Sequence, residues 1–557
     1  MSTLSLDRSG LIVAMDLSHQ DRASEDRMQT PLKSVGSGLP REIAAAEAGP
    51  ASATSTPRAS GSDSPAAHQS FLKRVVSFPA LLAALLVVAV FVPLRDFNVD
   101  PDLWWHLKVG QGILATHRWP TADTYSFTGA GTPWMAYEWL GETLLAATHG
   151  RWGLRGLLGL NLALGAAILL ALYALAWLRS GNSKPAFAAC ALLLPLTVGF
   201  FTLRPQMLAT LFLILTLIML ELFRRGRTGA LWLLPPLFLL WVNTHGSFVV
   251  GFFALGVYAV SGLREIRWGC LESFRWTAAQ RLRLGLVFLF SLMALLVTPY
   301  GPKLAGFPME MAFSHPLVVS SITEWRPIPF NLPVGKIFLA LLVGFLLVQI
   351  ILPLTWQLAE TTLFLAGVIA ACLHWRFLLV FVPFCAPLLA VILSRWMQPY
   401  EPGKDKHALN GLLIAAAVVS MVRFLPTQAQ LEQRVARHWP VETVQYIELH
   451  PPPQPMFNAY GFGGYLIFGL DGRNKVFIDG RTDLYEPFGV LADYQSITRV
   501  APNALALLWA YNVQSCLVHR DEALATLLTA SPVWSRVYAD DLAALFVRTQ
   551  RHLQAGE

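Results

Sequence analysis

The sequence predicts a polytopic α-helical membrane protein with about 11 transmembrane helices, a disordered N-terminus and a small C-terminal α/β domain. Hydrophobic residues make up 54% of the 557 residues and charged residues only 14%, with a mean hydropathy of +0.49. That composition is too apolar for a protein whose whole surface faces water. Apolar runs of about 15 to 20 residues recur along the chain, close to the length that a lipid bilayer requires. Beyond residue 425 the composition becomes mixed.

The segment 1–72 is predicted to be a disordered cytoplasmic leader. Ser, Ala, Gly, Pro and Thr dominate it, as in the stretch 51–57, and such a composition buries too little apolar surface to offset the entropy of ordering. The first long apolar run begins only near Val75, after Lys73 and Arg74. We therefore expect a retained helix there and not a secretory signal at the extreme N-terminus.

The segment 73–424 is predicted to form the transmembrane bundle. Its apolar runs place spans near 75–94, 156–178, 185–203, 207–223, 229–243, 247–263, 284–299, 337–355, 358–373, 377–394 and 408–424. With the N-terminus inside, the short inner loops hold most of the Lys and Arg residues, which agrees with the usual charge bias. The predicted inner turn at 356–357 carries no positive charge.

This orientation places two long loops, 95–155 and 299–336, and the tail 425–557 on the outer face. The tail combines short apolar runs, such as Tyr465–Phe468 and Lys475–Ile478, with a helix-like stretch at Ala504–Tyr511. About 130 residues are enough for one core. The tail is therefore predicted to be a soluble extracytoplasmic α/β domain.

Charge and cysteine usage argue against several classes of function. The net charge is +7, but the basic residues sit at the ends of apolar segments, where they orient helices against anionic lipid. We therefore expect no nucleic-acid partner. The five cysteines form no CxxC pair and no zinc-like spacing with histidine, so a disulfide framework or zinc site is not supported.

The first outer loop is rich in acids and aromatics. Asp100 and Asp102 follow the first span directly, and Glu138 and Glu142, four residues apart, would share one face of a helix. Carboxylates in such a position can act as a general base or bind a divalent cation. Asp-Pro-Asp could merely cap a helix that begins at Leu103, but capping accounts for one acid and not for the whole cluster. The tryptophans of the loop could stack on sugar rings, although a single one is more typical of a membrane-interface anchor; they are Trp104, Trp105, Trp134 and Trp139.

Further polar residues lie at the predicted outer ends of later spans. They are Arg204, Asn243, His245, Glu324, Arg326, His374 and Arg376. Snorkelling to the interface would explain a lone arginine. Arg204 and Arg376 occupy very short turns, where a charge is costly unless it faces a cavity, and a guanidinium suits a phosphate group.

The arrangement of one helix, a long acidic outer loop, a bundle with Arg, His and Glu on its outer side and an outer tail resembles the GT-C superfamily. These are polyprenyl-phosphate-sugar-dependent glycosyltransferases, and the nearest likeness is to bacterial relatives of protein mannosyltransferases and lipid A aminoarabinose transferases. The likeness covers residues 75–424, and its sharpest element is Asp100-Pro-Asp-Leu-Trp-Trp-His106. The protein mannosyltransferase pattern has an adjacent Asp-Glu pair, whereas proline separates the two acids here. In the tail, 457–466 and 476–485 look like the tails of uncharacterised bacterial membrane proteins of this type.

The resemblance implies an inverting transfer of a sugar from a polyprenyl-phosphate donor to a lipid, glycan or protein acceptor at the outer face of the bacterial inner membrane. It implies Asp100 or Asp102 as the catalytic base and leaves the choice between them open. The substrate-binding and phosphate-binding residues would be His106, Glu138, Arg204, His245, Glu324 and Arg376. A divalent cation is left open as cofactor. Asp479, Arg481 and Asp483 are interpreted as a salt-bridged turn without a catalytic role.

Two other functions fit a bundle of this kind. A transporter or lipid flippase would place charged or broken-helix elements near the membrane midplane. A non-catalytic scaffold for envelope assembly would use the outer tail to bind a partner. Most ionisable residues here map to the ends of the spans, which favours a reaction at the surface.

Overall fold

The structure is a computed structural model in which residues 71–314, 317 and 322–549 are described. The predicted leader, apart from residues 71 and 72, lies outside the described residues. All described residues belong to one compact unit.

Every predicted span coincides with a helix of the bundle. These helices are α2 (Phe78–Leu94), α4 (Trp139–Ser180), α5 (Ser183–Thr197), α6 (Pro205–Arg224), α7 (Leu234–Val242), α8 (Phe248–Ser261), α9 (Ala278–Ala294), α12 (Pro333–Ile351), α13 (Leu358–Leu373), α14 (Leu378–Leu393) and α15 (His407–Arg423). By length and composition, five helical segments of the described chain can cross a membrane, or six if α15 and the bent continuation α16 (Gln428–His438) form one span. The count of eleven crossings stays a prediction.

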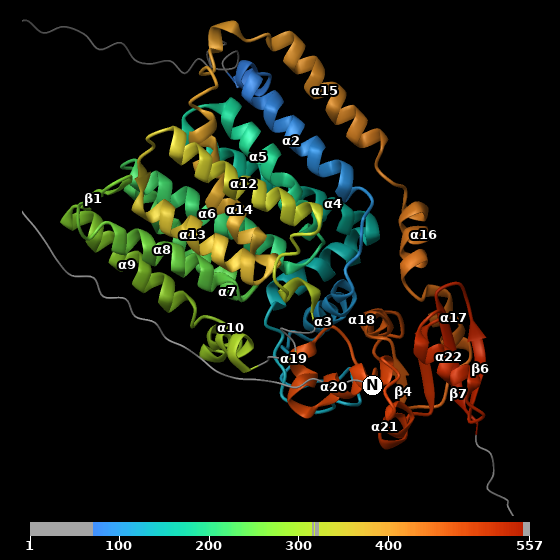
Figure 1. Cartoon of the computed structure of the whole chain (residues 1–557). Coiled ribbons are helices and arrows are strands. Elements are labelled where there is room, and N and C mark those ends of the chain that lie inside the picture. Colours follow the sequence, from blue (N-terminus) through green and yellow to red (C-terminus); the bar gives the residue numbers. More distant parts are fainter. Residues whose placement is uncertain (1–70, 315–316, 318–321, 550–557) are drawn as a thin grey trace, which may run out of the picture. The chain divides into compact units, whose positions relative to one another are not determined.

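The outer helices of the bundle expose large apolar side chains. Ile350 and Ile351 on α12 are each 72% exposed, and Val419 on α15 is 67% exposed. Apolar surface on this scale needs lipid as its solvent, because water-facing proteins rarely leave it uncovered. The chain is therefore a helical membrane protein. Figure 1 shows α15 running along α2, with which it packs.

The first outer loop contains more helix than its composition suggests. It includes α3 (Asp102–Thr116) and the first part of α4, which begins at Trp139. At Gly153 the backbone adopts φ 58° and ψ −150°, which breaks α4 into two helices. A positive φ costs little only for glycine. The predicted span 156–178 therefore corresponds to the second helix, whereas Glu142 lies on the first, which begins directly after Glu138.

The tail contains a four-stranded sheet with helices around it. The helices are α16, α17 (Val441–Leu449), α18 (Tyr460–Gly469), α19 (Thr482–Tyr485), α20 (Val490–Thr498), α21 (Ala504–Ala510) and α22 (Ala523–Ala530). The strands are β4 (Met456–Asn458), β5 (Ser515–His519), β6 (Trp534–Ala539) and β7 (Ala543–Arg548), in the order β4-β5-β7-β6. β4 and β5 are parallel, and the other two pairs are antiparallel.

The helix-like stretch at 504–511 is confirmed as α21, but the two short apolar runs are not strands of the sheet. Tyr465–Phe468 belongs to α18, and Val476 makes only an isolated bridge with Ser126 of the first loop. A helix buried on all sides and a buried strand give the same continuous apolar run, so the pattern alone does not separate them.

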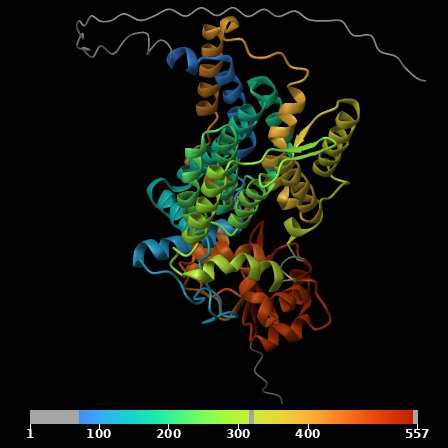
Figure 2. The ribbon, with the colours of Figure 1, turned by 90° about the vertical axis from the view of Figure 1, so that its left-hand side faces the viewer.

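The tail packs against the first outer loop. A Cβ on Gly464 of α18 would lie 2.6 Å from the carbonyl oxygen of Pro101, so only glycine permits this approach of α18 to α3. Figure 2 shows the orange and red tail segments below the bundle helices, on the side where the blue α3 lies. The acids of the first loop are thus covered by the C-terminal part of the chain.

At the other end of the bundle, a small sheet ties two connections together. β1 (Ile266–Trp268) and β2 (Leu271–Ser273) form a hairpin between α8 and α9, and β3 (Trp356–Gln357) pairs in parallel with β2. The predicted inner turn at 356–357 is this strand β3. Although the turn has no positive charge of its own, it lies beside the arginine-rich connection between α8 and α9.

Candidate functional site

Arg204 joins the two acids that follow the first helix. Its Nε lies 3.1 Å from Asp100 Oδ1, and its Nη2 contacts Asp102 Oδ2. Arg204 directly precedes α6, whose first residue is Pro205, and Asp102 is the first residue of α3. The Asp102 backbone N–H also donates to Asp100 Oδ1 over 3.0 Å, which turns both carboxylates toward the same guanidinium. The helix starts one residue before the predicted Leu103.

The environment drives the pKa values of the two carboxyls in opposite directions. Burial raises the pKa of Asp100 to about 6, although Arg204 opposes the shift. Burial acts on Asp102 as well, but the charge of Arg204 and hydrogen bonds from Arg204 and Trp105 Nε1 outweigh it and hold the pKa of Asp102 below its usual value. At neutral pH, Asp102 is the carboxylate that anchors the guanidinium, and Asp100 is the one poised to exchange a proton.

A second arginine reaches the same cluster through Glu324. This glutamate lies on η3 (Thr323–Trp325), with Oε1 3.6 Å from Arg204 Nη1 and Oε2 3.9 Å from Arg376 Nη1. Arg376, on η4 (Trp375–Phe377), donates from Nη2 to Gln206 Oε1 over 2.6 Å. Its guanidinium also lies 4.8 Å from the centre of the Trp325 ring. Such contacts fix the direction in which a guanidinium points.

Beside the charged cluster lies a buried chain of histidines and glutamates. His106 Nδ1 is hydrogen-bonded with Glu142 Oε1 at 3.1 Å, and His106 Nε2 lies 3.4 Å from Glu138 Oε2. Glu138 Oε1 lies 3.4 Å from His245 Nε2. Glu138 is the N-cap of α4 and Glu142 lies in its first turn, so the predicted pair on one helix face holds only for Glu142, although both glutamates reach the same imidazole.

His106, Glu138 and His245 are all neutral at pH 7. Burial lowers the pKa of His106 and of His245 to about 3, and burial raises the pKa of Glu138 to about 8. The contacts of Glu138 with the two imidazoles therefore join neutral groups. Neutral His245 accepts a hydrogen bond at Nδ1 from the Ser247 backbone N–H over 3.0 Å, which leaves Nε2 as its donor toward Glu138.

Gly480 of the tail packs against the acidic side of the site. A Cβ on Gly480 would lie 1.8 Å from Asp102 Oδ1 and 2.8 Å from Trp105 Nε1, so the backbone of the tail lies directly on the anchoring carboxylate. The next residue, Arg481, is fully buried; its Nη2 is 2.7 Å from Asp479 Oδ2 and its Nη1 is 2.6 Å from Asp123 Oδ1 of the first loop. The predicted salt bridge of this turn is confirmed for Asp479 and Arg481, and Arg481 also joins the tail to the first loop.

All eight predicted site residues lie in this assembly of contacts at one end of the bundle. Two further candidates do not: the side chain of Arg326 is exposed, and His374 Nδ1 contacts the Trp325 carbonyl oxygen. Asn243 accepts a hydrogen bond from Trp139 Nε1 over 2.8 Å.

The interface-anchor interpretation is wrong for three of the four tryptophans. Trp104, Trp105 and Trp134 are 2%, 2% and 4% exposed, so they are neither interface anchors nor open stacking platforms. Trp104 packs on aromatic rings of the tail, including Tyr465. These tryptophans are buried because the tail packs on this face of the first loop, and the composition of the loop does not indicate that packing.

The sequence interpretation missed Gln206, Gly480 and the pair of Arg481 with Asp123. Gln206 follows Arg204 closely, and its place in the motif Leu-Arg-Pro-Gln was the available signal. Asp123 and Arg481 are 358 residues apart, and neither has a local pattern that indicates the partner. For a metal ion, no group of three or more His, Cys, Asp or Glu side chains with suitable geometry exists among the described residues.

Comparison with known proteins gives likeness at the level of structure. No family model matches the chain, and no curated protein sequence matches it. The solved structure of ArnT from Cupriavidus metallidurans bound to undecaprenyl phosphate superposes with a TM-score of 0.50 and 16% identity, over 88% of this chain and 99% of that one. The apo structure of the same protein gives 0.48 and 17%, over 87% and 98%.

The archaeal oligosaccharyltransferase AglB from Archaeoglobus fulgidus, in complex with an inhibitory peptide and a dolichol-phosphate, gives a TM-score of 0.46 and 11% identity, over 86% of this chain and 75% of that one. ArnT and AglB are GT-C proteins. The likeness to lipid-bound ArnT shows that this chain has the GT-C fold.

Proposed function

We propose that this chain is a membrane glycosyltransferase that moves a sugar from a polyprenyl-phosphate donor to the hydroxyl group of a lipid, glycan or protein acceptor. The observation that carries the proposal is the pair Asp100 and Asp102 on one guanidinium, with pKa values driven in opposite directions. Two carboxyls with different protonation behaviour at one point are typical of acid–base chemistry. The GT-C fold, and the undecaprenyl phosphate and dolichol-phosphate bound to the similar proteins, support a lipid-linked donor.

Asp100 is the base in this proposal. A pKa of about 6 lets it be ionised at neutral pH and still accept a proton readily, whereas the lowered pKa of Asp102 makes that group a weaker base. Asp100 takes the proton of the acceptor hydroxyl while the acceptor oxygen bonds to the anomeric carbon. The bond between that carbon and the phosphate oxygen breaks, and the phosphate keeps the electron pair. A single displacement of this kind inverts the configuration at the anomeric carbon.

Arg204 and Arg376 meet the charge that develops on the departing phosphate. Their guanidiniums are held in place by Asp102, Glu324 and Gln206, so little reorganisation is required during the reaction. His106, Glu138 and His245 form the neutral side of the site and surround the donor and acceptor. Because the three are uncharged at pH 7, they add no repulsion against an anionic donor.

The proposed orientation keeps the N-terminus in the cytoplasm and puts the site and the tail on the outer face of the inner membrane. The site residues lie beside the start of α6 and of α14, and the arginine-rich connections lie at the opposite helix ends. Charge bias assigns those connections to the cytoplasm. Cys270 is exposed in the hairpin between β1 and β2. A membrane-impermeant maleimide should label it only from the cytoplasmic side.

One assay distinguishes the proposed enzyme from a transporter and from a scaffold. Purified protein in proteoliposomes is given a polyprenyl-phosphate-linked radiolabelled sugar and bacterial membrane extract as acceptor, and release of free polyprenyl phosphate is measured. We expect release by the wild type, a loss of about 100-fold or more in Asp100→Asn, and a smaller loss in Asp102→Asn. The matched control is Asp96→Asn, since Asp96 lies in the same loop, is exposed and pairs with Arg434 at 3.7 Å, outside the site.

Each alternative gives a different result. A transporter moves the intact donor across the bilayer without cleaving it, and a scaffold does neither. Folded Asp100→Asn and Asp102→Asn variants that both release polyprenyl phosphate at the wild-type rate contradict the proposed reaction.

A further inference from the structure

A second polar cavity lies at the end of the bundle opposite the acids. Its volume is about 290 Å³. Its lining includes the last residue of α6, Arg224, the last turn of α8 with Tyr258 and Ser261, and Glu360 in the first turn of α13. The other ends of these three helices lead to Arg204, His245 and Arg376. A 20-residue helix such as α6 is about 30 Å long. The cavity is therefore separated from the proposed transfer site by the thickness of a bilayer.

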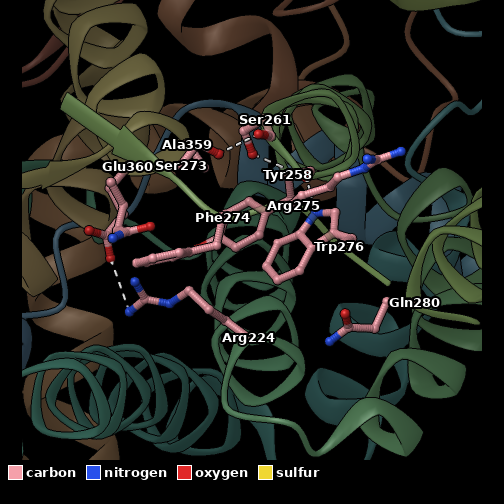
Figure 3. Close-up of a pocket in the computed structure, with 11 residues that line it drawn as sticks. Arg224, Tyr258, Ser261, Ser273, Phe274, Arg275, Trp276, Gln280, Ala359 and Glu360 are labelled. Carbon is pink, nitrogen blue, oxygen red and sulfur yellow. Dashed lines mark hydrogen bonds and ion pairs between the residues drawn. The ribbon is translucent and has the colours of Figure 1, made fainter. Parts of the chain in front are cut away.

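The walls of the cavity are fixed by packing. Trp276 Nε1 donates to the Tyr258 carbonyl oxygen over 2.9 Å, and a Cβ on Gly262 would lie 1.8 Å from the Trp276 ring. Ser273 Oγ donates to the carbonyl oxygen of Ser261. The hairpin β1–β2 is thus held against the end of α8, and Figure 3 shows Trp276, Phe274 and Tyr258 between Arg224 on one side and Ser261 on the other.

Positive charge exceeds negative charge around this cavity. Glu360 accepts two hydrogen bonds from Arg179, of 2.5 and 3.0 Å, and lies 3.4 Å from Arg224 Nη2. Glu221 pairs with Arg224 at 2.7 Å and with Arg225 at 2.9 Å. Three guanidiniums therefore share two carboxylates. Arg275 lines the cavity as well, and its guanidinium has no hydrogen-bond or ion-pair partner among the described residues.

A tyrosine hydroxyl in the wall also lacks a hydrogen-bond partner among the described residues. Tyr258 is 5% exposed and lines the cavity, and its hydroxyl makes no hydrogen bond with any residue that the structure describes. A hydroxyl that opens into a cavity can donate a hydrogen bond to a ligand there. An exposed aromatic residue belongs to the lining, since Phe274 is 53% exposed. Aromatic and basic residues together are typical of the level of lipid headgroups.

We propose that this cavity binds the phosphate group of an anionic phospholipid from the leaflet opposite the transfer site. Arg224 faces the phosphate, and the Tyr258 hydroxyl donates a hydrogen bond to a phosphate oxygen. Arg275, whose side chain extends away from Arg224 (Figure 3), attracts the anionic headgroup from the rim of the cavity, and Phe274 lies among the acyl chains. Basic cavities between transmembrane helices bind phospholipid headgroups in this manner. The inference does not depend on the proposed glycosyl transfer.

The test is lipid retention by the whole protein. Protein purified in detergent is incubated with phosphatidylglycerol or with phosphatidylcholine, passed over a size-exclusion column, and the lipid that stays bound is counted by native mass spectrometry. The double variant Tyr258→Phe with Arg275→Gln removes the two groups that have no partner and leaves the pairs of Glu360 and Glu221 intact. The matched control is Arg395→Gln, because Arg395 is an exposed basic residue just after the end of α14 and does not line the cavity.

We expect the wild type and Arg395→Gln to retain phosphatidylglycerol in preference to phosphatidylcholine, and the double variant to retain at least fivefold less phosphatidylglycerol. An added arm offers inorganic phosphate at millimolar concentration. Phosphatidylglycerol that stays bound in its presence supports a lipid ligand, and its full displacement assigns the cavity to soluble phosphate and overturns the proposal. Equal retention of both lipids, or equal retention by the double variant, overturns it as well.

Discussion

The two ends of the bundle carry opposite kinds of charge cluster. At the end covered by the tail, the site contains five carboxyl groups and two guanidiniums, and three of the carboxyls contact a guanidinium; the groups are those of Asp100, Asp102, Glu138, Glu142, Glu324, Arg204 and Arg376. At the other end, three guanidiniums share two carboxylates, from Arg179, Arg224, Arg225, Glu221 and Glu360.

An excess of carboxyls and an excess of guanidiniums have different uses. Crowded and buried carboxyls cannot all be ionised, so at least one has a raised pKa and can exchange protons, as the pKa of about 6 for Asp100 illustrates. Guanidiniums keep their charge in any such environment and can only attract anions. This difference agrees with the proposed proton transfer at the tail-covered end and with the proposed anion binding at the other end.

Loss of the bond between the tail and the first loop should have the largest effect. Arg481→Met leaves Asp479 and Asp123 buried without their cation, which should lower the free energy of unfolding by about 3–5 kcal/mol. Thermal unfolding in detergent, followed by circular dichroism, measures the change. The control Arg473→Met removes an exposed pair with Glu448 and should cost less than about 1 kcal/mol. Equal stability of both variants would show that the buried pair does not hold the tail.

Gly480→Ala should displace the Asp102 carboxylate without removing any charged group from the tail-covered end. The added Cβ has no room beside Asp102 Oδ1, so the carboxylate and Arg204 must shift, and transfer should fall about tenfold or more. Gly461→Ala is the control, since its Cβ would meet no atom within 4 Å. We expect near wild-type transfer for that variant. A Gly480→Ala protein with an unchanged rate would mean that the tail does not determine the geometry of the acids.

The transfer rate should depend on pH through Asp100. The base must be deprotonated, so the rate should fall about tenfold for each pH unit below about 6 and level off above that value. In Asp102→Asn this fall should move to lower pH, because the neighbouring negative charge that raises the pKa of Asp100 is gone. Initial rates between pH 4.5 and 8 measure both profiles. If the rate of Asp102→Asn falls at the same pH as the rate of the wild type, Asp100 is not the titrating group.

The smallest effect on transfer is expected at the guanidinium-rich end. Arg225→Gln removes one of the two arginines on Glu221 and should change the transfer rate less than about twofold, because this end takes no part in the reaction. The same assay of polyprenyl phosphate release measures it. A tenfold loss of transfer rate would show that the two ends of the bundle are coupled.

Local patterns predicted the helices and the site candidates but not what covers them. Apolar runs located every bundle helix, since a membrane-spanning segment has a strong signal of its own. The charged residues at the ends of those helices then met at one site, as Asp100, Arg204 and Arg376 do. The contacts of Gly480 with Asp102 and of Arg481 with Asp123 join segments more than 350 residues apart, and a single sequence gives no periodic signal for them.

The central claim is that the first loop and the later helices form one site, and disulfide trapping tests it most directly. Thr202 Oγ1 lies 3.4 Å from Asp100 Oδ2, so Asp100→Cys combined with Thr202→Cys, in a background without the five natural cysteines, places two thiols side by side. With a protease site inserted between them, mild oxidation of native membranes should keep the two fragments together until reductant is added. Fragments that separate without reductant, while both thiols remain open to maleimide, would contradict the claim.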